Sequence, residues 1–531
     1  MNDLPYSYHT FLFPFVWNDK GNLSRGEFEK VLSQKHWYEI GEEDIAVSKG
    51  EPYKFDYALY QYLTIPARKF VFPQKSDKDA LVHNFEFRYN GNKNSLSDEG
   101  EYIITKGKEV FTLRFNGIRL KIFTIGIAIL ILETEYYGDK YVLDSDETTK
   151  AFCLEDINKI NEFGRRVNLP FIGSEENPCS VAADEIAIRF SRDKAPLHDH
   201  FKEVLVRCAQ DGEELSLTYI MKPIKDILTI DSNSQLTTKR EDKDEKNQRF
   251  YIYPATDDRM FVCCLVRNDE LCIKFSQWGY DKYKYLSSSS SVGTTLYKFA
   301  FIENNCNCQS KIMSKKLFVN GVNNRWIDYK TLYAVTHYSL MAVTGEEDAL
   351  RTVVVNPFLT QYVQLSILAL AQRAAILLFS ARAADVASNL NAIDLSKIAK
   401  IDILQKNYVQ MQNQILIYEA TTQEQGVELF QMLIKQLHIK ENKAELDGQI
   451  SNLRDAANIS HSRIELRSLS WLTIILALFA FLTLGFMVFL PYNEIAINII
   501  AVVLIVGTAP LFLINVYHHY NNYYKNCKKR K

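Results

Sequence analysis

The sequence has almost no net charge, because 62 lysines and arginines stand against 64 aspartates and glutamates. A protein that holds nucleic acid on a basic surface carries a clear surplus of cations, so we expect no direct nucleic-acid partner. The nine cysteines also lack zinc-ligand spacing, since Cys263 and Cys264 are adjacent and a single residue separates Cys306 from Cys308. We therefore expect reduced thiols, as in cytosolic proteins, and no covalently attached cofactor.

Signatures of catalysis are missing as well. The sequence contains no Walker loop, no Gly-x-Gly-x-x-Gly and no His-Glu-x-x-His. His198 and His200 are a candidate metal pair, but without a third ligand surface histidines are the favoured interpretation, and the metal ligands stay unknown. With no nucleophile, base or metal constellation we expect that the protein is not an enzyme; a membrane-tethered enzyme is a less favoured alternative.

Charge is nearly absent from Ser468 to Tyr524, where Glu494 is the only charged residue. Two apolar runs, Leu469–Leu490 and Ile495–Tyr517, each reach the ~20 residues that cross a bilayer as a helix. Their four-residue connection predicts an antiparallel transmembrane hairpin. A buried hairpin of a soluble core is the alternative.

Cations flank both ends of this hairpin, with arginines before it and a basic tail, residues 518–531, after it. By the positive-inside rule we expect both termini in the cytoplasm of a multi-pass protein of the inner, or plasma, membrane. The first residues carry no basic region of a signal peptide, so we expect the chain before Ser468 to stay in the cytoplasm.

Proline is absent between Pro357 and Pro491, and this segment has heptad-like apolar spacing. Pro357 looks like a first helical residue, and an unbroken helix of ~50 residues is predicted from about Lys440 to Leu490. The spacing predicts helix-on-helix seams. The seam residues are Leu404, Tyr408, Met411, Ile415 and Tyr418, then Phe430, Leu433 and Leu437, then Leu446, Ile450, Leu453, Ala457 and Ile464.

The fold class that follows is an α/β cytoplasmic domain, a long helical stalk and a C-terminal two-helix transmembrane hairpin. We place the head at 1–345, the stalk at 346–468, the transmembrane helices at 469–517 and the tail at 518–531. Within the head, a helix is expected at Cys153–Phe163. Strands are expected at Phe11–Trp17, Lys69–Phe72, Ile122–Leu132, Ile186–Phe190, Leu215–Tyr219, Phe250–Tyr253, Met260–Val266 and Thr295–Ile302.

Two short groups in the head are suited to binding a nucleotide. Arg165 and Arg166 follow Gly164, and adjacent guanidinium groups suit a bidentate grip on phosphate. Asp257, Asp258 and Arg259 stand at the start of a predicted strand, where the carboxylates suit ribose hydroxyls, an amine or a cation. The alternative for both groups is a structural ion pair that joins Arg165 or Arg166 to Asp257 or Asp258.

A single two-helix hairpin forms no pore, so a conduit needs several copies around an axis. We expect the first membrane helix to line it with an inward stripe, and the outer loop to form the mouth. In the alternative, the threonines merely bond their own helix backbone. The predicted pore residues are Thr473, Leu476, Ala480, Thr483 and Met487 in the stripe, with Asn493 and Glu494 at the mouth.

From Pro357 onward this arrangement resembles the CorA superfamily of divalent-cation channels. Gln372-Arg373-Ala374 and the segment 422–429 (TQEQGVEL) are similar to stalk sequences of bacterial CorA-like proteins. The magnesium transporters carry Gly-Met-Asn at the end of the first span, whereas this chain has Leu-Pro-Tyr-Asn-Glu at 490–494. Asn493 alone is equivalent, so the resemblance does not carry magnesium selectivity with it.

Three head segments resemble a divergent CorA-like branch of membrane effectors of type III CRISPR systems. They are residues 9–15 (HTFLFPF), 164–166 (GRR) and 257–261 (DDRMF). The resemblance implies a pentameric homo-oligomer in the lipid bilayer, with a nucleotide second messenger, an S-adenosylmethionine–AMP conjugate (SAM-AMP) or related adenylate, as activating ligand.

We therefore expect a nucleotide-gated channel that permeabilises the membrane in antiphage defence. The alternative is a housekeeping transporter of divalent metal cations such as Mg²⁺, gated by the transported ion itself, which would bind at acidic sites of the head.

Overall fold

The computed structural model describes the chain in segments and divides it into two compact units. Unit 1 comprises residues 1–387 and 403–450, and unit 2 comprises residues 388–402 and 451–531. Unit 1 therefore includes much of what the sequence analysis assigned to the stalk. The described residues are 4–18, 25–30, 32, 35–44, 54–77, 80–89, 99–143, 148–168, 182–191, 195–201, 203–204, 220–229, 236–237, 250–280, 291–388 and 395–489.

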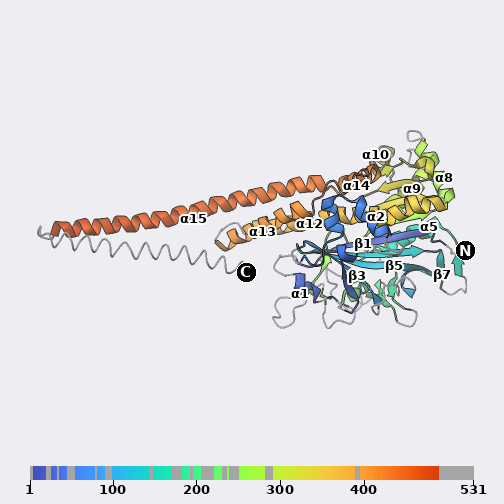
Figure 1. The fold of residues 1–531 in the computed structure, drawn as a ribbon, viewed down its shortest axis with the longest axis horizontal. Coiled ribbons are helices and arrows are strands. Elements are labelled where there is room, and N and C mark those ends of the chain that lie inside the picture. The colour runs from blue at the N-terminus through green and yellow to red at the C-terminus, as the bar shows by residue number, and fades with distance from the viewer. Residues whose placement is uncertain are drawn as a thin grey trace. The chain divides into compact units, whose positions relative to one another are not determined.

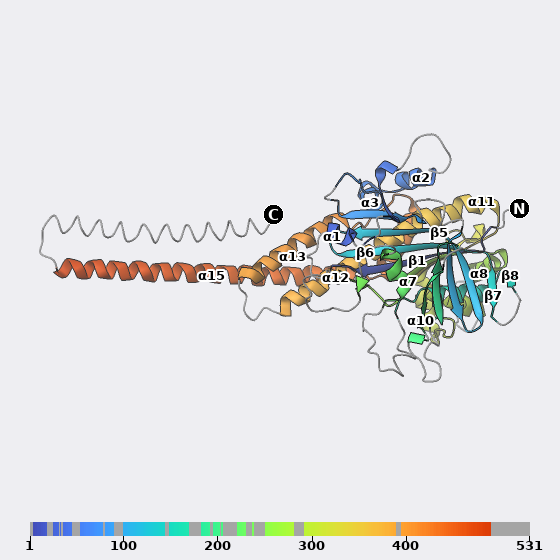
Figure 2. The ribbon, with the colours of Figure 1, turned by 90° about the horizontal axis from the view of Figure 1, so that it is seen from below.

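A mixed sheet forms the centre of unit 1 (Figures 1 and 2). The described strands follow the order β10-β9-β4-β5-β6-β1-β14-β17-β16-β15, with β2, β3, β7, β8 and β13 joined to it at the side. Their bounds are β1 Ser7–Val16, β2 Trp37–Ile40, β3 Val82–Phe87, β4 Glu101–Lys106, β5 Glu109–Phe123, β6 Ile127–Tyr136, β7 Asp139–Val142, β8 Thr148–Lys150, β9 Glu185–Arg189, β10 Leu197–His200, β13 Tyr253–Pro254, β14 Phe261–Arg267, β15 Val322–Asn323, β16 Leu332–Val335 and β17 Ser339–Thr344. A separate short pair joins β11 Leu236–Thr237 to β12 Phe250–Tyr251.

The central strand β1 is buried along all ten residues, which explains its continuous apolar sequence. It pairs antiparallel with β6 over its whole length and, on the other side, with β14 from Ser7 to Leu12. Beyond that point its partner is β13, which pairs with Phe15 and Val16. Pro14 lies where the partner changes, an interruption of the ladder at which a residue without an N–H is tolerated.

The long hairpin β5–β6 turns at Gly126, which has φ +110° and lies against the carbonyl of Asn18. The apolar run Ile122–Leu132 predicts one strand, but the left-handed glycine divides the run between two strands. Arg382, from a distant helix, fixes the turn by donating to the carbonyls of Asn18 (2.6 Å) and Ile125 (2.8 Å).

Helices cover both faces of the sheet, as the adjacent thiols on β14 demonstrate. The thiol of Cys263 lies next to Ser366 of α12, whereas that of Cys264 lies next to Asn161 of α5 on the opposite face. Burial raises the pKa of both thiols to about 12, which suits inert core residues. The helices are α1 Arg25–Glu29, α2 Lys54–Tyr62, α3 Ile65–Val71, α5 Leu154–Gly164, α7 Lys222–Thr229, α8 Asp269–Tyr280, α9 Ser291–Phe301, α10 Lys311–Gly321, α11 Asp348–Leu350, α12 Val363–Ser388, α13 Leu395–Gln414, α14 Glu424–Gln436 and α15 Ile439–Phe489.

Two of the predicted strands are helices instead. Lys69–Phe72 lies mostly in α3, whose first turn contains Pro66, and Thr295–Ile302 lies mostly in α9. In α9 the buried side chains Leu296, Phe299 and Ala300 follow helical spacing, a signal that the β-rich composition masked. β9, β14 and α5 agree with the predicted ranges within one residue. β1 ends one residue before the predicted strand Phe11–Trp17 but begins four residues before it, at Ser7. Leu215–Tyr219 lies outside the described residues.

The predicted helix start at Pro357 is wrong. The helical run begins at Asp348 and passes through Pro357, which lies between π-helical turns at Arg351–Val355 and Phe358–Tyr362. Wide turns of this kind accommodate a residue that cannot donate an N–H.

The seam residues of the predicted stalk are buried, apart from partly exposed Tyr418 and Ile464. α15 confirms the predicted unbroken helix, with 51 residues from Ile439 to Phe489 (Figure 1). Tyr408 and Gln412 of α13 both donate to Asp447 of α15 and thereby join these helices within unit 1.

Two described helical runs are long and apolar enough to cross a membrane. In the first, Asp348–Ser388, most of the apolar window is buried, as in the core helix of a folded domain. In the second, Ile439–Leu482, none of the apolar window is buried, and Phe481 is 80% exposed. The predicted second span, its loop and the basic tail lie outside the described residues.

Acid should destabilise unit 1 through His9, because burial, opposed in part by the hydrogen bond to Asn161, lowers its pKa from 6.5 to about 4. Between these values the unfolded chain binds the extra proton, so the free energy of unfolding falls as the pH falls from 6.5. We expect the wild type to lose about 3 kcal/mol more than His9→Gln between neutral pH and pH 4. Denaturant titration followed by the fluorescence of buried Trp17 and Trp37 measures this difference. Equal losses in the two proteins would contradict it.

Candidate functional site

The candidate site begins at the end of α5, which a buried polar contact ties to the central strand. His9 Nδ1 donates to Asn161 Oδ1 at 2.8 Å, and His9 Nε2 lies 2.8 Å from the hydroxyl of Ser7. The hydroxyl of Tyr102 donates to the carbonyl of Gly164 at 2.7 Å. Gly164 is packed so closely that an added Cβ would lie 2.7 Å from Ile104 Cδ1. These contacts fix the point at which Arg165 and Arg166 leave the helix.

The backbone brings together the two groups that the sequence analysis selected. Arg166 and Arg259 form an antiparallel β-bridge, in which the N–H of Met260 donates to the carbonyl of Arg165 at 2.7 Å. The N–H of Val167 donates to the carbonyl of Asp258 at 3.1 Å. All five predicted ligand residues, Arg165, Arg166, Asp257, Asp258 and Arg259, therefore lie at one place.

Ion pairs join these residues. Arg166 Nη1 lies 2.7 Å from Asp258 Oδ2. Arg259 lies 3.2 Å from both Asp257 and Asp258, through Nη2 and Nε respectively. The alternative that the sequence analysis left open, ion pairing of Arg166 with Asp258, is thus present. A ligand anion would have to compete with these carboxylates.

Arg165 lies beneath this layer and is 3% exposed. Its Nη2 donates to the carbonyl of Ile302 at 3.4 Å, and within the described residues its Nε and Nη1 have no hydrogen-bond partner. Burial, aided by Arg259 and Arg166, lowers the pKa of Arg165 to about 10. A buried cation with unused donors is costly, so Arg165 makes the site attractive for negative charge.

The two carboxyl groups titrate differently. Burial raises the pKa of Asp258, and the neighbouring Asp257 raises it further despite Arg166. Burial also works against the ionised form of Asp257, but hydrogen bonds from Asp258 and Arg259 outweigh it and lower the pKa of Asp257. Asp258 is therefore the carboxylate that gives way more readily to another anion at Arg166.

Three residues that the sequence did not predict, Tyr338, His337 and Arg373, complete the cluster. Two cations lie over the ring of Tyr338, with the guanidinium carbons of Arg259 and Arg165 at 4.9 Å and 5.5 Å from its centroid. Arg373 of α12 approaches His337 at 3.4 Å between Nη1 and Nδ1. No local pattern marks Tyr338 or His337 as site residues, and Arg373 belongs to a motif that was assigned to the stalk.

His337 connects the cluster to the start of α15. Its Nδ1 lies 3.0 Å from the carbonyl of Gln436 at the end of α14, and its ring centroid lies 6.1 Å from that of His438. His438 adopts a left-handed backbone, φ 54°, between α14 and α15. The N–H of Asn442 then donates to the carbonyl of His438 at 3.0 Å. The ligand cluster and the first turn of α15 therefore share one neighbour.

The predicted pore residues are described only in part. Thr473 donates its hydroxyl to the carbonyl of Leu469, as the alternative for the threonines supposed, and Leu476 is exposed. Ala480 lies in the same helix, and Thr483 and Met487 lie in its last described turns. Asn493 and Glu494 lie outside the described residues.

No known protein family, no curated protein and no solved structure matches this chain.

Gly164→Ala should destabilise unit 1 by about 1–3 kcal/mol, because the added methyl group meets Ile104 Cδ1 and the Phe11 ring in a closely packed core. The double variant Gly164→Ala with Ile104→Val should recover part of this loss, since Val lacks the Cδ1 atom. Denaturant unfolding of the four proteins in a double-mutant cycle measures the coupling. Additive effects would contradict this account of the glycine.

Proposed function

We propose that the chain is a subunit of a homo-oligomeric membrane channel whose cytoplasmic head is gated by an anionic nucleotide. The observation that carries the proposal is α15, a single helix that begins in unit 1 at Ile439 and continues into exposed apolar residues of unit 2. One continuous helix thus links unit 1, which contains the polar, cation-rich site, to the exposed apolar residues. The protein is not proposed to be an enzyme.

The apolar part of α15 supports the membrane role. Large side chains such as Leu469, Trp471, Leu478 and Phe481 are more than half exposed, which is costly in water and favourable in hydrocarbon. With Ile495–Tyr517 as a second span, both termini would lie in the cytoplasm of an inner-membrane protein. Several copies, five by the CorA resemblance, would enclose the pore.

The arginine cluster supports a phosphate-bearing ligand. Arg166 and Arg259 are partly exposed, with 15% and 26% of their side-chain surface accessible, so an entering phosphate meets them first. There it would replace Asp258 at Arg166, and the buried charge of Arg165 would add to the attraction. The displaced Asp258, together with Asp257, would then be available to a nucleoside hydroxyl or amine, or to the positive sulfonium of a SAM-AMP-like messenger.

His337 offers a route from ligand to helix. A phosphate that draws Arg259 away from Tyr338 changes the packing next to His337, which bonds the last turn of α14. A small movement there alters the junction at His438 and hence the direction of α15. Gating follows if the ligand binds more tightly to the head of the open state than to that of the closed state. Membrane permeabilisation in a type III CRISPR antiphage response is the context that the resemblance supplies.

Arg166→Gln should weaken adenylate binding by about 10- to 100-fold, the value of a charge-assisted contact. Asp258→Asn should strengthen it by about fivefold, because a competing negative charge is gone. The measurement is titration of the detergent-solubilised chain with SAM-AMP, with AMP and inorganic phosphate as comparison ligands. The matched control is Arg325→Gln, which breaks an ion pair with Glu428 outside the cluster.

A purely structural cluster would lose stability in both variants without opposite effects on binding. No affinity of the wild type for any adenylate would also overturn the nucleotide proposal. Ion flux in liposomes tests the channel itself: dye or ion release only with nucleotide supports gating, whereas Mg²⁺ flux without nucleotide would favour the transporter.

His337→Ala should separate binding from opening. We expect nucleotide-stimulated flux to fall about tenfold or more. Nucleotide affinity should be unchanged or tighter, because binding no longer has to shift the channel from its closed to its open state. Parallel liposome flux and binding assays on the same preparation measure both. Wild-type flux in this variant at saturating nucleotide would show that the signal does not pass through His337.

A further inference from the structure

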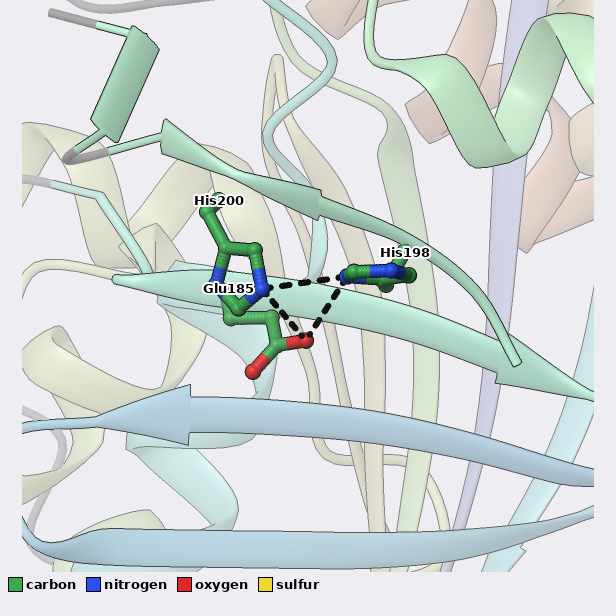
Figure 3. Close-up of side chains that lie close together, drawn as sticks. All are labelled: Glu185, His198 and His200. Carbon is green, nitrogen blue, oxygen red and sulfur yellow. Dashed lines mark hydrogen bonds and ion pairs between the residues drawn. The ribbon is translucent and has the colours of Figure 1, made fainter. Parts of the chain in front are cut away.

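A second group of chemically active side chains lies on strands β9 and β10, apart from the residues of the arginine cluster. The two strands pair antiparallel, with His200 opposite Glu185 and His198 opposite Ala187. Because side chains alternate along a strand, His198 and His200 point to the same face, where Glu185 joins them. Figure 3 shows the three side chains converging. The sequence showed only the two histidines, since Glu185 precedes them by more than ten residues.

The distances among the three ligand atoms are those of a metal site. Glu185 Oε1 lies 3.4 Å from both His198 Nδ1 and His200 Nε2, and these two nitrogens lie 3.0 Å apart. Ligands at ~2.0–2.1 Å around a tetrahedral ion are separated by about 3.3 Å. The carboxylate distances are too long for good hydrogen bonds, whose N···O distances lie near ~2.9 Å. One ion can therefore contact all three atoms with shifts of a few tenths of an ångström.

The site is open on one side and anchored on the other. The side chains of His198, His200 and Glu185 are 47%, 36% and 27% exposed, so solvent reaches the group. Between the histidines, Asp199 points to the opposite face and accepts the N–H of Lys222 at the start of α7, at 2.8 Å. This bond and the β9 ladder hold β10 in register. Among the described residues this is the one group of three such ligands.

We propose that Glu185, His198 and His200 bind a divalent transition-metal ion of the Zn²⁺ class, with solvent in the remaining position. Imidazole nitrogen with one carboxylate suits Zn²⁺, Co²⁺ or Ni²⁺, whereas Mg²⁺ and Ca²⁺ take oxygen ligands. The ion clamps β10, which ends the described order of the main sheet, to its neighbour β9. Metal bound to the folded state alone stabilises it, so the chain should unfold at a higher temperature with the ion than without it.

Cobalt provides a direct probe, because four-coordinate Co²⁺ absorbs visible light strongly. The full chain in detergent, stripped with a chelator, should bind one Co²⁺ with visible absorption. Zn²⁺ should displace it and Mg²⁺ in excess should not. Nitrogen and oxygen ligation gives no sulfur-to-cobalt band in the near ultraviolet, which separates this site from binding at Cys306 and Cys308.

His198→Ala and His200→Ala should each weaken Co²⁺ binding by about 100-fold or more, since even indirect partners of a metal contribute 10–100-fold. Glu185→Gln should weaken it while keeping the side-chain shape. The matched control is His461→Ala. His461 lies 3.4 Å from Glu465, so it belongs to a pair of potential metal ligands rather than to a group of three.

Circular dichroism at neutral pH checks that each variant is folded. Because both histidine side chains are partly exposed, their replacement leaves the core packing unchanged. The proposal is overturned if the wild type takes up no Co²⁺, if the cobalt spectrum carries the sulfur band alone, or if the folded histidine variants bind as tightly as the wild type.

Discussion

The burial of β1 is the constraint on which unit 1 depends. A fully buried strand must pair its backbone on both sides, and β1 does so with β6 on one side and with β14 and then β13 on the other. The same strand holds α5 through His9 and Asn161, while β14 begins just after Arg259. The two groups of the arginine cluster, 92 residues apart between Arg166 and Asp258, therefore meet because both are attached to neighbours of one strand.

The cluster combines attraction for anions with internal competition. Arg166 and Arg259 are engaged by Asp257 and Asp258, so these arginines are held in place without a ligand. Arg165 has fewer hydrogen-bond partners, and its buried position next to Tyr338 keeps positive charge inside the site. Such a site favours a ligand that carries both phosphate and a group able to bond the released carboxylates. An inorganic phosphate ion contacts the arginines but has no group that bonds the released carboxylates.

The sequence predicted elements whose periodicity is long and regular. α15 and the buried seam residues follow from heptad spacing, and the strands β1, β9 and β14 follow from their composition. The strand predictions at Lys69–Phe72 and Thr295–Ile302 were wrong because short apolar stretches fit either a strand or a helix. Tertiary packing decides between the two. The ion pair between Arg166 and Asp258 was one of the pairings that the sequence allowed as an alternative to ligand binding. Tyr338 and His337 were out of reach, because the pairing of β14 with β17, far apart in sequence, places them beside their partners. Glu185 was out of reach because the register between β9 and β10 places it beside the histidines.

The π-helical turns on either side of Pro357 have a consequence for how this chain tolerates length changes. A wide turn already contains one residue more than a regular turn, so an inserted or deleted residue near 351–362 can be absorbed there by converting one kind of turn into the other. In α15 the same change would rotate every later side chain by about 100° around the helix axis. Relatives that differ by a single residue should therefore carry the difference before α12 and keep the spacing of α15 intact.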